Sequence, residues 1–153
     1  MTTDSATLMR RWFEEVWNKG NYAVIDELAS PNVKAQGQAE HPVRIGREQF
    51  RLFAQGIRSA FPDIHITVHD TIEQHDRVAV RWSATMTHHG PFLGMAPTGR
   101  KATINGITWA RVENGQIIEG WDNWDQMGLL VQLGSVPHVS FLQDTAAEAK
   151  KAS

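Results

Sequence analysis

Apolar residues recur three or four positions apart in the first part of the chain, which is the spacing of one face of an α-helix. The clearest stripe consists of Met9, Trp12, Phe13 and Val16. This spacing predicts three helices, over residues 5–19, 21–29 and 46–62. Asp4 or Ser5 is placed to cap the first helix, and Gly20 suits the position just past its end.

The period changes from helical to alternating at residue 63, and alternation is the pattern of half-buried β-strands. It predicts four strands, over residues 64–73, 78–87, 100–113 and 116–125. Asn114 and Gly115 form a two-residue turn between the last two strands, because both residues tolerate a positive φ. A short irregular strand is expected over residues 33–43, and a short helix over residues 126–133.

The order of the elements, with helices first and a meander of strands afterwards, predicts an α+β protein. One face of a curved antiparallel sheet must then be buried against the N-terminal helices, and strong curvature leaves a cone-shaped cavity between them. The helices and strands occupy residues 1–134, which we interpret as one domain. Residues 135–153 become small and polar and are expected to form a C-terminal tail.

Composition narrows the class of protein. The 153 residues include no cysteine, which excludes disulfides and thiolate metal sites. The formal net charge of -2, with both signs interspersed, argues against binding to nucleic acid or to an anionic membrane. The polar N-terminus lacks the features of a signal peptide, and no apolar run approaches the roughly 20 residues of a membrane span. We therefore expect a cytoplasmic protein.

No metal site is expected from the histidines. His65 and His69 lie four positions apart on a predicted strand, a separation of roughly 13 Å, which is too large for a shared ion.

Four short segments occur in the order and spacing of a known family. They are residues 94–100, 111–117, 119–125 and 132–134. Together they resemble the landmarks of SnoaL-like polyketide cyclases and of the related ester cyclase proteins. The resemblance implies the nuclear-transport-factor-2-like fold, also described as a cystatin-like α+β barrel, in which a cone of helices and a curved sheet enclose an apolar pocket.

The resemblance also implies an activity. Characterised members close a polyketide ring by intramolecular aldol condensation without metal or cofactor, and an Asp at the end of the last strand serves as acid and base. That Asp matches Asp125 here. The substrate would be a small apolar or polycyclic carbonyl compound, and a homodimer is expected because this fold commonly pairs through its sheet. A non-catalytic protein that binds a small apolar ligand, and an isomerase or hydrolase of the same fold, remain alternative functions.

The aldol reaction needs a carboxyl group that both takes and returns a proton. Burial in an apolar pocket suits a carboxyl group to this role, because it raises the pKa toward neutrality. On the last strand Asp125 shares one face with Trp121 and Asn123, so Asn123 is placed to orient it. Two other interpretations stay open. Asp125 could serve only as the cap of the following helix, and a bulge that shifts the register would turn Asp122 into the pocket instead.

Other candidate side chains belong to the same pocket. His88 shares its parity with the apolar residues of its strand, and His41 follows the second helix; both are candidate polar groups. Candidate flat walls for a planar ligand are Trp12, Trp82, Trp109 and Trp121. The apolar loop over residues 91–95 would form a rim or lid of the pocket, or else a dimer contact.

Overall fold

The computed structural model describes residues 4–37 and 43–136 and has the α+β architecture expected from the sequence. His41 and most of the expected C-terminal tail, residues 137–153, lie outside the described residues.

The helices follow the apolar stripes. α1 (Ser5–Trp12) begins after Asp4, whose carboxylate accepts a hydrogen bond from the N–H of Thr7 at 2.6 Å. α1 runs directly into the π-helical segment η1 (Phe13–Asn18), so the single helix expected over residues 5–19 has two kinds of backbone hydrogen bonding. The other helices are α2 (Ala23–Leu28), α3 (Arg47–Ala60) and α4 (Gln126–Gln132).

Six strands form one sheet in the order β2-β1-β6-β5-β4-β3. Their bounds are β1 (Ala29–Gln36), β2 (Val43–Ile45), β3 (His65–Gln74), β4 (Arg77–Thr87), β5 (Lys101–Glu113) and β6 (Gln116–Trp124). β3 to β6 are the expected antiparallel meander, and Asn114 and Gly115 both have positive φ in its last turn. β1 pairs antiparallel with β2 but parallel with β6, so the expectation of an antiparallel sheet fails for this one pair.

β1 begins earlier than the sequence predicted. Ala29 was expected to end a helix, but it is the first residue of the strand. The pairing of β1 with β6 is interrupted between Ala29 and Lys34, and Pro31 falls inside this interruption. Because proline has no N–H to donate to a neighbouring strand, such a break is where a strand tolerates it.

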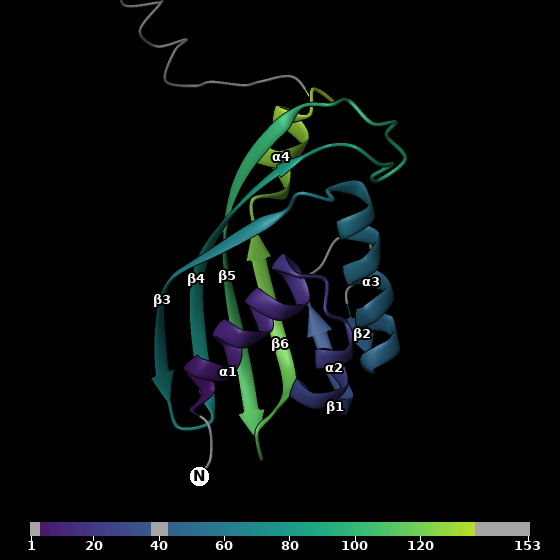
Figure 1. Ribbon diagram of the computed structural model, residues 1–153. Helices are drawn as coiled ribbons and strands as arrows, with labels where there is room; N and C mark the ends of the chain where they lie inside the picture. The colour runs from purple at the N-terminus through teal and green to yellow at the C-terminus, as the bar shows by residue number, and fades with distance from the viewer. Residues whose placement is uncertain (1–3, 38–42, 137–153) are drawn as a thin grey trace, which may run out of the picture.

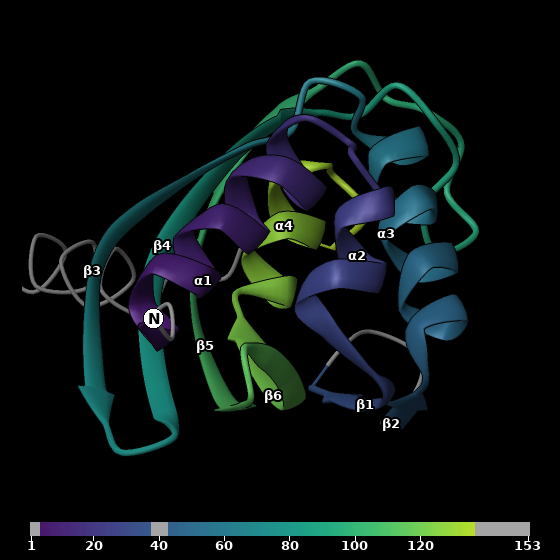
Figure 2. The same ribbon diagram turned by 60° about the horizontal axis from the view of Figure 1, so that its bottom comes forward.

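The sheet curves around the helices, as Figures 1 and 2 show: α1 crosses its inner face, and α2 and α3 lie beside α1. Alternation along β4 defines that inner face, since its buried apolar side chains are Val78, Val80, Trp82, Ala84 and Met86. None of the helices within the described ranges is long and apolar enough to cross a membrane.

Candidate functional site

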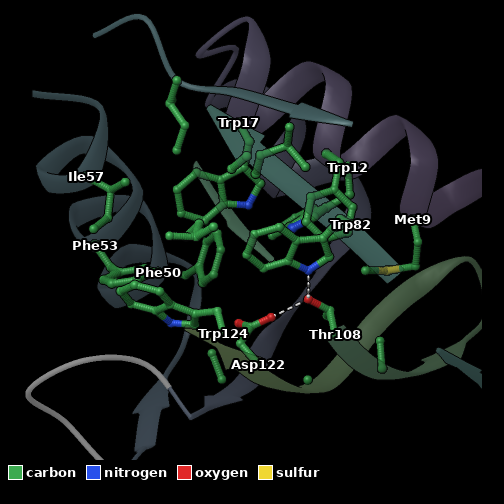
Figure 3. Close-up of a pocket in the computed structure, with 18 of the residues that line it drawn as sticks. Met9, Trp12, Trp17, Phe50, Phe53, Ile57, Trp82, Thr108, Asp122 and Trp124 are labelled. Carbon is green, nitrogen blue, oxygen red and sulfur yellow. Dashed lines mark hydrogen bonds between the residues drawn. The ribbon is translucent and has the colours of Figure 1, made fainter. Parts of the chain in front are cut away.

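An apolar cavity lies between the inner face of the sheet and the helices (Figure 3). Much of its wall is aromatic, with rings contributed by both layers. These rings belong to Trp12, Phe13, Trp17, Phe50, Phe53, Phe61, Trp82, Phe92 and Trp124. Two of the helices in the wall contact each other through Trp12 on α1 and Phe50 on α3, whose ring centroids are 5.0 Å apart. The cavity can therefore hold a flat, apolar molecule between aromatic faces.

A polar group interrupts this apolar wall at the sheet. Asp122 on β6 lines the cavity and is half-buried, and it is the acidic residue among the described residues of the lining. The hydroxyl of Thr108, on the neighbouring strand β5, donates a hydrogen bond to Asp122 Oδ1 at 2.5 Å. The indole N–H of Trp82, on β4, donates to Thr108 Oγ1 at 3.0 Å.

The inward direction of Asp122 comes from a bulge in β6. Ile117 and Gly120 both line the cavity although three positions separate them. The extra residue is taken up where the pairing of β5 with β6 shifts, between the pair Val112–Ile117 and the pair Arg111–Glu119. Beyond the shift, Asp122 lies opposite the inward-facing Thr108. This is the register that the sequence analysis held open as the alternative.

Asp125 lies outside the cavity, contrary to its expected placement. Its side chain is exposed and accepts a hydrogen bond from the N–H of Gly128 at 2.8 Å, so it caps α4. Asn123 is also exposed and does not contact Asp125 through any hydrogen bond within the described residues. Both residues border a shallow hollow on the outer side of the sheet, together with Arg81 and Ile107. The β6 bulge explains this placement, because it exchanges the two faces of the strand beyond residue 119.

His88 is completely buried but does not line the cavity. Its Nδ1 accepts a hydrogen bond from the N–H of Thr98 at 3.2 Å and lies 3.0 Å from the Thr98 hydroxyl. Its ring packs on Phe61, with centroids 5.5 Å apart, and Phe61 in turn contacts Phe92 at 5.2 Å. His88 therefore holds the loop that follows β4, and Phe92 from that loop lines the cavity.

Two of the four candidate tryptophans lie on the inner side of the sheet, and two lie on its outer face. Trp12 and Trp82 line the cavity. Trp109 and Trp121 do not: they pair with each other across β5 and β6 on the outer face, with ring centroids 4.7 Å apart. The alternating pattern of β5 already argued against Trp109 as a cavity residue. Thr108 and Ala110, on either side of it, face inward, so Trp109 faces outward.

Several residues of the site were not singled out from the sequence. Trp17 and Trp124 line the cavity, and Thr108 supplies the hydrogen bond to Asp122. Trp17 continues the helical stripe at four positions from Phe13, so the periodicity carried a signal for it. Thr108 carried none, because its role depends on a cross-strand neighbour that the local pattern does not specify.

The fold and the site define a small α+β protein with an apolar cavity and, among the described residues, one carboxylate in its wall. The sequence model of the SnoaL-like polyketide cyclases matches residues 7–133, and the chain belongs to this family. Its fold is the nuclear-transport-factor-2-like fold that the resemblance implied.

Solved structures agree with this assignment. AclR from Streptomyces galilaeus, a candidate hydroxylase, is 28% identical with a TM-score of 0.78, and the match covers 97% of this chain and 94% of AclR. IdmH from Streptomyces antibioticus, a candidate polyketide cyclase, is 32% identical with a TM-score of 0.74, covering 86% and 99%. A candidate SnoaL-like polyketide cyclase from Jannaschia sp. CCS1 is 25% identical with a TM-score of 0.79, covering 86% and 92%. No curated protein matches the chain.

Proposed function

We propose that this protein is a cyclase that closes a ring in a polyketide-type carbonyl compound by an intramolecular aldol reaction, with Asp122 as the acid and base. The observation that carries the proposal is the Asp122 carboxylate in the wall of an otherwise largely apolar cavity. Membership of the SnoaL-like family and the likeness to IdmH support the same reaction class.

The proposed reaction needs two proton transfers and one new carbon–carbon bond. The Asp122 carboxylate removes a proton from a carbon next to a carbonyl group, which leaves an enolate. The enolate carbon attacks a second carbonyl carbon of the same molecule, and the electron pair of that C=O bond moves to its oxygen. The protonated Asp122 then returns the proton to this oxygen. The reaction is an isomerisation in which atoms and electrons balance without an oxidant or reductant, so we propose that it needs no cofactor.

The apolar wall assists both steps. Exclusion of water strengthens the interaction between the carboxylate and the proton that it removes, because the local dielectric constant is low. The aromatic faces of Trp12, Trp82 and Trp124 would hold a flexible substrate folded, with its two reacting carbons close together. In this proposal the protein mainly orients the substrate and supplies one carboxyl group, that of Asp122, which takes up and returns the proton.

Asp122→Asn tests the proposal directly. An amide cannot accept the proton, so kcat for ring closure of a linear poly-β-ketone methyl ester should fall at least ~100-fold. Binding of the same compound, followed by quenching of tryptophan fluorescence, should change little because the aromatic wall is intact. Turnover is measured by liquid chromatography and mass spectrometry of the cyclic product.

Asp125→Asn is the matched control, because it makes the same chemical change three residues away on the opposite side of the strand. It should retain near wild-type kcat. Loss of turnover in Asp125→Asn with normal turnover in Asp122→Asn would return the catalytic role to Asp125. Binding of the compound without turnover in the wild-type protein would favour the non-catalytic alternative.

A further inference from the structure

A chain of hydrogen bonds runs across the inner face of the sheet through three neighbouring strands, and Figure 3 shows it from end to end. It begins at the indole N–H of Trp82 on β4, passes through the hydroxyl of Thr108 on β5, and ends at Oδ1 of Asp122 on β6. Trp82 and Thr108 are both buried. In the proposed reaction only the last member, Asp122, exchanges a proton, and the hydrogen bonds of Trp82 and Thr108 have no role yet.

The chain has a fixed direction. An indole nitrogen can only donate, so it occupies a lone pair of Thr108 Oγ1. The hydroxyl proton of Thr108 is then directed at Asp122. A neutral Asp122 that donated to Thr108 would leave the Thr108 proton without an acceptor, so its proton would have to lie on Oδ2. Oδ1 would then accept from Thr108 as the oxygen of a neutral carboxyl group, and this hydrogen bond is weaker than one to a carboxylate. The arrangement therefore favours the ionised form of Asp122 over the neutral form.

The position of the indole is set by the backbone beneath it. Trp82 lies opposite Gly106 in the pairing of β4 with β5. A Cβ atom at Gly106 would come within 2.3 Å of Trp82 Cζ2, so the indole occupies the space that any side chain at this residue would need. On its other side the indole contacts Phe13, with ring centroids 6.1 Å apart. The donor at the start of the chain is thus held between the sheet and η1.

We propose that Trp82 is a positioning residue which, acting through Thr108, holds Asp122 as a carboxylate before substrate enters the cavity. This inference rests on the proposed role of Asp122 as the base. Trp82 then has a second role beyond its contribution to the apolar wall. Gly106 supports this role, because it leaves the space that the indole occupies. A base that is already ionised and oriented accepts the substrate proton without first rearranging the cavity.

Among the described residues, the elements packed around the cavity contribute few charged side chains. The lining residues of α1, η1, α3 and α4 carry no charge. On β1 Lys34 lines the cavity, and on β2 Arg44 is buried with its guanidinium 4.2 Å from the centre of the Phe53 ring. Both stay positive through the acid range, so they act equally on every variant compared.

The test is a titration of Asp122 by carbon NMR of the carboxyl group in the full-length protein, with the signal assigned from Asp122→Asn. Thr108→Val removes the donor at nearly constant shape and should raise the pKa of Asp122 by about one. Thr108→Ser keeps the hydroxyl and should restore the wild-type titration. Trp82→Phe keeps an aromatic ring but removes the N–H, and it should shift the titration in the same direction as Thr108→Val but less.

The double variant with Trp82→Phe and Thr108→Val tests whether the two residues act on the pKa of Asp122 in series or independently. Because Trp82 acts only through Thr108, adding Trp82→Phe to Thr108→Val should cause no further shift. An unchanged titration in Trp82→Phe, or full additivity in the double variant, would overturn the inference. A purely structural role of Trp82 would lower the temperature of unfolding without moving the titration.

A second measurement uses the wild-type protein alone, in case the Trp82 variant folds poorly. The indole proton of Trp82, assigned from its nuclear Overhauser contacts with Thr108, should shift with pH as Asp122 titrates, and this response should vanish in Asp122→Asn. An indole signal that ignores Asp122 would also overturn the inference. Failure of the proposed function looks different, since it leaves these titrations intact and appears as normal turnover in Asp122→Asn.

Discussion

Asp125 shows how one side chain fixes the start of a short helix. Its carboxylate accepts the N–H of Gly128, and a Cβ atom at Gly128 would lie 2.0 Å from Asp125 Oδ2, so the cap depends on both residues. Asp125→Ala should lower the free energy of unfolding by about 1 kcal/mol, as measured by urea denaturation. Asp125→Asn should retain most of the stability, because Asn is also a good cap. Equal stability of all three proteins would contradict this role.

The sequence contained both interpretations of Asp125 and Asp122 but could not choose between them. The decision depends on a single extra residue in β6, near Ile117 and Ile118. Because these two adjacent residues are both apolar, the alternation is ambiguous just where the register changes. The cap could be predicted because it is local. The inward direction of Asp122 could not, because it is set by the pairing of β6 with β5.

At the scale of elements, Asp63 links the end of α3 to the end of β4. Its carboxylate accepts hydrogen bonds from the N–H of Thr87 at 2.7 Å and from the Thr87 hydroxyl at 2.6 Å. Burial alone would raise the pKa of Asp63, but these two donors, together with the backbone N–H of Asp63 and the charge of His89, outweigh it and hold the pKa below its ordinary value. The contact therefore stabilises the folded protein fully above the unfolded pKa of about 3.9, and this stabilisation is lost as the pH falls through the lower folded pKa.

Asp63→Asn should remove this part of the pH dependence. The loss in free energy of unfolding between pH 5 and pH 3, from urea denaturation at about five pH values, should be smaller in the variant than in the wild type. Thr87→Val should act in the same direction, because it removes the hydroxyl donor to Asp63. A wild-type pH dependence in both variants would show that the contact does not stabilise the fold.

The elements themselves were predictable to the extent that their signals are local. α1, α3 and the strands β3 to β6 follow a clear helical or alternating pattern. The π-helical segment η1 keeps the same apolar stripe as an α-helix, so the pattern does not reveal it. The parallel pairing of β1 with β6 joins residues more than eighty positions apart, and no feature of either segment specifies its direction.

At the scale of the whole molecule, the outer face of the sheet carries an exposed apolar row. The pairings of the strands place Ile72, Ala79, Trp109 and Trp121 side by side from β3 to β6. Ile72 is 74% exposed, and Ile107, beside Trp109 on the same face, is 51% exposed. Apolar surface arranged in this way is typical of a protein–protein contact.

The charges around this row favour a second copy of the chain as its partner. Arg81 pairs with Asp70 on one side of the row, and Arg111 pairs with Glu119 and Glu113 on the other. Arg77, whose guanidinium lies 5.8 Å from the centre of the Trp109 ring, is a third positive charge beside these three carboxylates. The face therefore presents no single sign of charge that would select an acidic or basic partner. We therefore propose that the expected homodimer forms through this face, as an isologous contact.

Ile107→Lys tests the homodimer without touching the cavity, because Ile107 points away from it. Two lysines brought together in an apolar contact would be desolvated without partners, so the variant should be monomeric in sedimentation velocity where the wild type is dimeric. Leu52→Lys, an equally exposed leucine on α3, is the control and should remain dimeric. A monomeric wild type, or a dimeric Ile107→Lys protein, would exclude this face as the interface. Since Asp122 faces the opposite side of the sheet, the monomeric variant should keep its ring-closing activity, which would separate assembly from catalysis.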